Sequence, residues 1–581
     1  MSLFAGVIDI YSQSIKVKEN FKNVFWSSIY NINLQTVILE DEKSCIIKGD
    51  IGAFPEMGFY EEPETGFAIL AGDPLLTDEY NIKIPRDQAI YNIYNKLKEK
   101  NYDVLNECNG NFALCYYDLK RDILILSVDK VGIRPIYYCY SNQSLYFSTS
   151  LKILENNDAI KKKMDLVGIA EKLSLNSFIG NRTKYVNIKT LRGGQYFIKE
   201  KPNDHVVKYF KWDSIEESKL PLGDRLSEIS NIFNQAIKDR LPQNEQIISF
   251  LSGGLDSRCV VTALYDMRKS LITYNLSYAG TQDYVFGNQF ASSINSRHFD
   301  LYSFKHELSD MMSYLDGMKS LIDYLYINES SNNISKLIFS GEGGSVGLGH
   351  VYMSEDIVNL MRQNQINKVI RLYLKNKKLP KKLLKPYIYE RLNDAIYEDL
   401  RKELNLINSY DSARNFYIFL IDNDQRCHLR NFYENIDFYN FELVTPFFDS
   451  RFLEKVVSFN IDDFLYHKFY TEWLELFPTI IKKVPWQTYK NHIPCPIPSE
   501  GAIDQWSFEK SVKKKRESRY LSKLLRNLFN VNFASNILNP SVYLPMILLH
   551  FSRYKNYSSE FKWVSTLQNI YDICNGDFEI K

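Results

Sequence analysis

Short runs of apolar and aromatic residues follow one another through the first 209 residues of the chain. They are rich in Ile, Val, Phe and Tyr, and Gly, Asn, Asp or Pro bound each run, which is typical of strands separated by turns. We therefore expect residues 1–209 to form an antiparallel, sheet-dominated domain. The clearest of the predicted strands are Phe67–Leu70, Phe112–Tyr117, Ile123–Val128, Ile136–Tyr140 and Leu145–Ser148.

The hydrophobic period changes after the charged stretch Asp213–Arg225, which we interpret as a linker. Beyond it, helical and strand patterns alternate, and this alternation predicts a parallel sheet with helices on its faces. A second domain is therefore expected over residues 220–500. Its first elements are predicted as helices over Leu226–Leu241 and Arg258–Met267 and as strands over Gln246–Leu251, Leu271–Tyr278 and Lys336–Phe339.

Residues 501–581 are expected to form a helical C-terminal extension. Within it, the basic run Lys513–Arg516 is interpreted as a solvated helix face, because Glu509, Glu517 and apolar residues flank it. The apolar stretch Val542–Phe551 is far shorter than the roughly 20 residues that span a bilayer. No membrane segment is predicted.

The composition narrows the possible partners. The length of 581 residues exceeds that of a single small binding module. Lys and Arg total 71 against 70 Asp and Glu, so a net charge of +1 provides no general attraction to nucleic acid or to an anionic membrane. Any polyanion must therefore be held by a local device.

The cysteines and the first residues indicate a compartment. The eight cysteines form no CxxC pair, which favours reduced thiols and a cytoplasmic protein. Residues 1–10 carry no basic lead, so a secretory signal peptide is not expected.

The segment Ser252–Ser257 is the strongest candidate for a local site that could hold a polyanion. It reads Ser-Gly-Gly-Leu-Asp-Ser and lies between a predicted strand and a predicted helix. Two adjacent glycines let the backbone approach a phosphate, and the helix N-terminus supplies free N–H groups. Ser252 and Ser257 add hydroxyl donors, while Asp256 suits a Mg²⁺ ion that bridges phosphate oxygens. The alternative interpretation is a tight turn with an N-cap serine.

This segment resembles the pyrophosphate-binding loop of the ATP pyrophosphatase superfamily, and specifically of the asparagine synthase (glutamine-hydrolysing) family. Further stretches resemble that family in the same order along the chain. They are Val128–Tyr138, similar to R-D-x-x-G-I-K-P-L-Y-Y; Phe147–Ser150, similar to F-A-S-E; Ser340–Gly344, similar to the second active-site loop; and Glu442–Asp449, similar to E-x-R-x-P-F-L-D.

The resemblance implies an α+β sandwich of the N-terminal nucleophile type over residues 1–209, followed by an α/β ATP pyrophosphatase domain. Such an enzyme adenylates a carboxylate with ATP and Mg²⁺, and an amine or ammonia then displaces AMP. The expected partners are therefore a small-molecule carboxylate and an amine or ammonia, with no nucleic acid and no membrane. The oligomeric state is not predicted, and a homodimer is one of the states considered.

The resemblance also assigns roles to individual residues. Asp256 would hold the metal, and Glu342 would take a proton from the attacking amine. Lys468 would stabilise charge on the adenylated intermediate, with a solvated helix lysine as the alternative. The nucleotide contacts would come from the first loop and its neighbours, namely Leu251, Ser252, Gly253, Gly254, Ser257, Leu276, Ser340 and Gly341.

The N-terminal part differs from the family at the positions of the nucleophile and of the glutamine pocket. The nucleophilic cysteine of the family is replaced by Ser2, in Met-Ser-Leu-Phe-Ala-Gly. Serine is far less nucleophilic than cysteine near neutral pH unless a base activates it. The glutamine-pocket stretches are also altered, to Ala71–Pro74 and Asn109–Phe112. We therefore expect a domain without glutaminase activity, as in the beta-lactam synthetase and lasso peptide cyclase relatives.

The second part departs from the family as well. Gly344 stands at the position we assign to the family's second metal-binding aspartate, followed by Ser345, and Val444 replaces the arginine of E-x-R-x-P-F-L-D. An active amide ligase remains the preferred interpretation. The alternative is a catalytically inactive nucleotide-binding or scaffolding homologue.

Overall fold

The computed structural model describes residues 2–8, 14–30, 34–200, 203–242, 246–300, 314–328, 334–375, 377, 379–488, 492–498, 531–552, 554–555 and 557–580. The basic run Lys513–Arg516 and the side chain of Ser2 lie outside this description.

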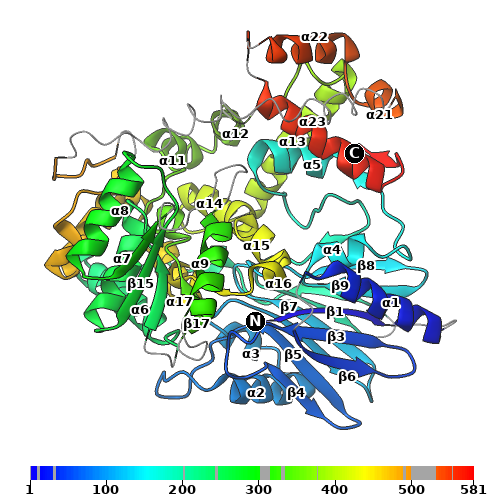
Figure 1. The fold of residues 1–581 in the computed structure, drawn as a ribbon, viewed down its shortest axis with the longest axis horizontal. Helices are drawn as coiled ribbons and strands as arrows, with labels where there is room; N and C mark the ends of the chain where they lie inside the picture. Colours follow the sequence, from blue (N-terminus) through cyan, green and yellow to red (C-terminus); the bar gives the residue numbers. More distant parts are fainter. Residues whose placement is uncertain are drawn as a thin grey trace.

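The N-terminal part contains two stacked antiparallel sheets (Figure 1). One has the order β11-β8-β9-β1-β3-β2 and the other the order β13-β12-β7-β6-β5-β4. The strands of the first are β1 (Ser2–Ile8), β2 (Gln35–Glu40), β3 (Cys45–Asp50), β8 (Tyr137–Ser141), β9 (Ser144–Ser148) and β11 (Lys189–Thr190). Those of the second are β4 (Phe59–Glu62), β5 (Gly66–Gly72), β6 (Phe112–Asp118), β7 (Ile123–Val128), β12 (Gln195–Lys199) and β13 (His205–Lys208).

Side chains along a strand point alternately to its two faces, and this explains how the sheets stack. In β1, Phe4 and Ile8 join a core that contains residues of both sheets, whereas Leu3, Ala5 and Val7 join the core that contains α1 (Ser14–Ser28). Helix α2 (Arg86–Lys98) packs on the outer face of the second sheet. The antiparallel domain expected from the short apolar runs is confirmed, with helices on its outer faces.

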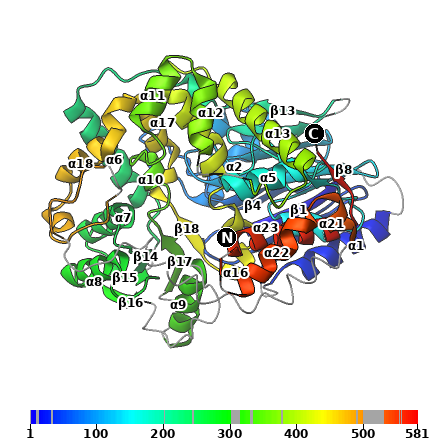
Figure 2. The same ribbon diagram turned by 90° about the horizontal axis from the view of Figure 1, so that it is seen from above.

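A five-stranded parallel sheet of order β16-β15-β14-β17-β18 forms the centre of the following part. The strands are β14 (Gln246–Phe250), β15 (Ser270–Asn275), β16 (Arg297–Asp300), β17 (Ile334–Phe339) and β18 (Glu442–Val444), each parallel to its neighbour. Helices surround it (Figure 2), among them α6 (Leu222–Lys238), α7 (Leu255–Asp266), α8 (Gln282–Ser293) and α9 (Tyr314–Asn328).

The predicted parallel sheet is thus confirmed. The structure differs from the prediction in where the first helix of this part begins. Helix α6 begins at Leu222, inside the charged stretch interpreted as a linker, directly after Pro221. Because β14 and β17 are adjacent and parallel, the loops that follow them meet at the same edge of the sheet.

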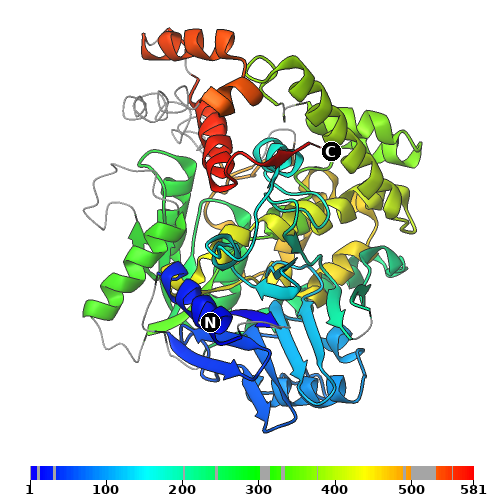
Figure 3. The same cartoon turned by 90° about the vertical axis from the view of Figure 1, so that its right-hand side faces the viewer.

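The described part of the C-terminal extension is helical and touches both preceding parts (Figure 3). It contains α21 (Val531–Asn536), α22 (Pro540–Phe551) and α23 (Ser558–Ile573). The final strand, β19 (Phe578–Glu579), pairs in parallel with β10 (Met164–Asp165), and Leu538 forms a bridge with Leu384 just before α13 (Pro386–Leu406). Among the described helices, none is long and apolar enough to cross a bilayer.

Candidate functional site

The first glycine loop turns sharply between β14 and α7. The Ser252 N–H donates to the Ser257 hydroxyl at 2.9 Å, and the Gly254 N–H donates to the Ser252 hydroxyl at 3.2 Å. A Cβ on Gly253 would lie 2.6 Å from the carbonyl oxygen of Gln282, so only glycine fits against the start of α8. The Gly253 N–H donates to Asp283 at 3.1 Å. The loop is therefore held in a tight, hydroxyl-rich conformation at the N-terminus of α7.

The second glycine loop, Ser340–Gly344, lies against the first. The buried Ser340 is fixed by its N–H, which donates to the Val444 carbonyl at 2.9 Å. A Cβ on Gly341 would lie 2.3 Å from the Ser257 nitrogen. The two loops are thus in backbone contact, and glycine at 341 makes this approach possible.

Asp256 lies between the two loops and is held by two hydroxyl groups. The Ser345 hydroxyl donates to Oδ2 at 2.5 Å, and the buried Tyr470 hydroxyl donates to Oδ1 at 2.7 Å. Burial raises the pKa of Asp256 to about 6, against these hydrogen bonds, which lower it. The two hydrogen bonds therefore fix the direction of the carboxylate, and its raised pKa means that it takes up a proton more readily than an exposed aspartate.

The donor set around Asp256 suits a metal that brings other ligands with it. No group of three or more His, Cys, Asp or Glu that could hold a metal occurs among the described residues. Mg²⁺ commonly binds through one or two carboxylates together with substrate phosphates and waters. Asp256 and the adjacent Ser345 hydroxyl fit that mode, with the phosphates of a nucleotide supplying further oxygens.

Positions 344 and 345 both face Asp256, but only position 345 has room for a side chain. A Cβ on Gly344 would lie 2.6 Å from Cγ of Asp256, so no side chain fits there without displacing the carboxylate. Ser345 instead directs its hydroxyl to Asp256. A second metal-binding carboxylate would therefore have to stand at 345, one residue after the position assigned from the sequence.

Glu342 forms a close pair with a histidine that the sequence did not single out. Its Oε2 lies 2.5 Å from Nε2 of His428. Burial acts to raise the pKa of Glu342, but His428 and Tyr314 outweigh it and hold the pKa below its usual value. Burial acts to lower the pKa of His428, but Glu342 outweighs it and raises the pKa. The two groups therefore form an ion pair near neutral pH.

Among the described residues, Lys468 forms no hydrogen bond or ion pair with either glycine loop. Lys468 begins the short helix α18 (Lys468–Trp473), and its side chain is exposed. Tyr470, two positions later and therefore on nearly the opposite side of the helix, is the residue that reaches Asp256. Leu251 and Leu276 directly follow the neighbouring strands β14 and β15, and Leu251 is buried whereas Leu276 is half-buried.

A segment from Thr479 to Thr488 crosses the first loop and is fixed by an arginine of α7. The buried Arg258 donates to the carbonyls of Val484 at 2.6 Å and Pro485 at 2.7 Å, and also to Ile481. The Gln487 N–H donates to the Gly253 carbonyl at 3.0 Å. This segment therefore belongs to the walls of the site, although no sequence signal marked it.

Two buried basic side chains of the N-terminal domain bind the main chain of the altered pocket. The guanidinium of Arg86 donates to the carbonyls of Gly72, Leu70 and Glu56. Lys48 donates to the Leu70 carbonyl at 2.8 Å. Both side chains are buried, so they occupy the main-chain acceptors at the end of β5.

Comparisons with known proteins agree with this arrangement. The glutamine amidotransferase domain family matches residues 89–210, and the asparagine synthase family matches residues 228–467. Putative asparagine synthetase [glutamine-hydrolyzing] 2 of Methanocaldococcus jannaschii is 27% identical over 312 residues, which cover 51% of this chain and 59% of the relative. Asparagine synthetase [glutamine-hydrolyzing] 3 of Bacillus subtilis is 25% identical over 197 residues, which cover 32% of this chain and 31% of the relative.

A longer alignment is found with asparagine synthetase B [glutamine-hydrolyzing] of Escherichia coli. It is 20% identical over 414 residues, which cover 64% of this chain and 68% of the relative. The similarity to the Methanocaldococcus and Bacillus proteins thus spans less than two thirds of their length.

Proposed function

We propose that this chain, which belongs to the asparagine synthase family, is an ATP-dependent ligase that adenylates a carboxylate and joins it to an amine or ammonia. The observation that carries the proposal is the backbone contact between two glycine loops at the carboxyl ends of adjacent parallel strands, with Asp256 between them. Ligands of open α/β sheets bind at such an edge.

The first loop is suited to the pyrophosphate part of ATP. The hydroxyls of Ser252 and Ser257 and the first N–H groups of α7 can donate to phosphate oxygens, and the helix dipole favours the negative charge. Asp256 would hold Mg²⁺, which neutralises the charge that develops on the leaving pyrophosphate. Leu251, Leu276, Ser340 and Gly341 are proposed to contact the nucleotide.

The chemical steps then balance without a further reactant. A substrate carboxylate oxygen attacks the α-phosphorus of ATP, and pyrophosphate leaves with the bond electrons. The amine nitrogen next attacks the carbonyl carbon of the acyl adenylate, and AMP leaves as the amide forms. The proton lost by the amine passes to Glu342, whose partner His428 stabilises the carboxylate form beforehand. The role of Lys468 in stabilising charge on the adenylated intermediate is proposed from family resemblance alone.

The reaction is tested by incubating the full chain with ATP, Mg²⁺ and pairs of carboxylates and amines. We expect at least one pair to yield AMP and pyrophosphate in equal amounts, and Asp256→Asn to remove this turnover. Release of ADP and inorganic phosphate would show a different reaction class. Saturable ATP binding without AMP from any pair would favour the second candidate, an inactive nucleotide-binding homologue, which the exposed Lys468 supports.

Glutamine is not expected to supply the ammonia. Because Arg86 and Lys48 occupy the carbonyls at the end of β5, restoring the nucleophile alone should not restore the pocket. We expect Ser2→Cys to release glutamate from glutamine no faster than the unchanged chain or Ser2→Ala, measured by coupled glutamate assay. A Ser2→Cys protein with clear glutaminase activity would contradict this interpretation of the N-terminal domain.

A further inference from the structure

A groove of about 480 Å³ lies between the neighbouring helices α11 (Glu355–Arg362) and α12 (Ile366–Leu374), at the surface of the molecule (Figure 2). Helix α11 and its end contribute Asp356, Asn359, Leu360 and Gln363, and α12 and its end contribute Lys368, Arg371, Leu372 and Lys375. Leu360 and Leu372 are half-buried and pack against the core, whereas the polar lining residues are exposed. The groove therefore has an apolar floor and polar walls.

Three cations form one wall of the groove, and we call them the basic wall. Lys368, Arg371 and Lys375 are three and four positions apart, so their side chains lie on the same face of α12. All three are exposed, and among the described residues none forms an ion pair or a hydrogen bond through its side chain. Like charges at this spacing destabilise a helix. The basic wall therefore lacks the anions that would balance its charge.

The imbalance of charge extends along the chain on both sides of α12. Residues 357–389 contain nine Lys or Arg and no Asp or Glu, although the whole chain carries a net charge of only +1. Such a local excess of one sign attracts the opposite charge over about a Debye length, roughly 10 Å at about 0.1 M salt. The groove thus belongs to a segment that is suited to attract an anionic partner.

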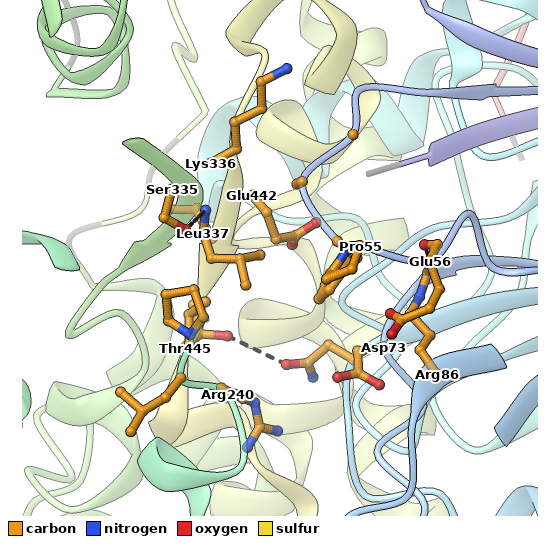
Figure 4. A pocket seen from close by; sticks show the side chains of 18 of the residues that line it. Pro55, Glu56, Asp73, Arg86, Arg240, Ser335, Lys336, Leu337, Glu442 and Thr445 are labelled. Carbon is orange, nitrogen blue, oxygen red and sulfur yellow. Dashed lines mark hydrogen bonds between the residues drawn. The ribbon is translucent and has the colours of Figure 1, made fainter. Parts of the chain in front are cut away.

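The cations of the cavity between the N-terminal sandwich and β18 are in a different condition (Figure 4). Arg86 donates to three main-chain carbonyls. Arg240 donates to Asp449 at 2.7 Å. These side chains are already bound within the protein, whereas those of the basic wall are available to a partner.

We propose that the groove between α11 and α12 binds an acidic peptide segment, whose Asp or Glu carboxylates pair with the basic wall. A helical peptide presents carboxylates at the same spacing of three and four positions. Its apolar side chains can then pack on Leu360 and Leu372, as in other complexes in which a helix lies in a groove. Charge complementarity sets the register of the peptide along α12.

Two features of the lining favour a peptide over a nucleic acid. Asp356 places a carboxylate in the groove, and it would repel phosphate groups. The described residues that line the groove include no aromatic side chain, whereas proteins commonly hold single-stranded nucleic acids by stacking the bases on aromatic rings. The proposal does not rest on the ligase reaction, because none of the residues of the two glycine loops lines the groove.

The binding is tested on the full chain by fluorescence anisotropy with a labelled peptide of about 20 residues, long enough to form a helix. The peptide carries Glu at positions i, i+3 and i+7 and Leu on the adjoining face. We expect saturable binding that weakens as salt is added, and no binding of the same peptide with Gln in place of Glu. Replacing the whole basic wall, with Lys368→Glu, Arg371→Glu and Lys375→Glu together, should weaken binding about tenfold or more, since three exposed ion pairs become repulsive.

The matched control is the triple variant Lys16→Glu, Lys43→Glu and Lys120→Glu, which changes the net charge equally at exposed positions of the N-terminal part. It should bind the peptide as the unchanged chain does. No saturable binding of the Glu peptide at low ionic strength, or equal binding by the two triple variants, would overturn the proposal.

Tighter binding of a single-stranded oligothymidylate or of phosphatidylserine vesicles than of the peptide, lost when the basic wall is replaced, would overturn it in favour of a nucleic acid or a membrane surface. AMP release is measured separately and tests the ligase reaction alone.

Discussion

Replacing Gly341 with alanine is expected to reduce ATP-dependent AMP formation by about a hundredfold, the scale on which a displacement of about 1 Å affects catalysis. A Cβ at this position would lie 2.3 Å from the Ser257 nitrogen and 2.5 Å from the carbonyl carbon of Asp256. Both are backbone atoms of the first loop and cannot rotate away. The two loops must therefore separate, and Asp256 moves relative to the nucleotide.

Gly347→Ala is the matched control for this variant. It adds the same methyl group in the same segment, at a position where the nearest atoms, on Phe452 and Leu453, lie at 3.8 and 3.9 Å. We expect it to retain activity within a few-fold, because such a distance is an ordinary contact. Equal activity of the Gly341 and Gly347 variants would contradict the close approach of the loops.

Arg258→Met is expected to detach the segment Thr479–Thr488 from the first loop. The arginine is fully buried, donates to three carbonyls of this segment and lies 4.7 Å from the centre of the Phe290 ring. Leaving buried carbonyls without a donor costs about 1–3 kcal/mol each, so a total of about 3 kcal/mol or more is expected. Limited proteolysis within residues 479–488 should then be about a hundredfold faster.

The control for Arg258→Met is Arg268→Met, in the turn that follows α7, where the side chain is exposed. It removes an equal charge without removing a buried donor, so its proteolysis should match that of the unchanged chain. The Arg258 variant should also bind ATP more weakly, because the Gln487 N–H is bonded to the Gly253 carbonyl. Unchanged cleavage in the Arg258 variant would mean that the segment is held by other contacts.

Local patterns in the sequence were sufficient to predict the sheets and both glycine loops. The change from short apolar runs to alternating helices and strands marks the antiparallel sandwich and the parallel sheet. Ser252–Ser257 can be recognised in the sequence because its glycines, the strand before it and the helix after it are all adjacent along the chain. The structure differs chiefly at boundaries, such as the earlier start of α6 at Leu222.

The partners of the site residues could not be predicted in this way. Ser345, His428 and Tyr470 meet Asp256 or Glu342 across 86 or more positions of sequence. No local pattern encodes such contacts. The resemblance assigned a role to Lys468 and none to Tyr470, the residue two positions later that reaches Asp256.

The central claim is that the two loops form a Mg²⁺-dependent ATP site, and calorimetric titration of the full chain with ATP measures it directly. The account predicts saturable binding that weakens when Mg²⁺ is removed and weakens again in Asp256→Asn, which keeps the shape of the side chain but not its charge. Absence of saturable ATP binding, or binding that neither Mg²⁺ removal nor Asp256→Asn changes, would contradict it.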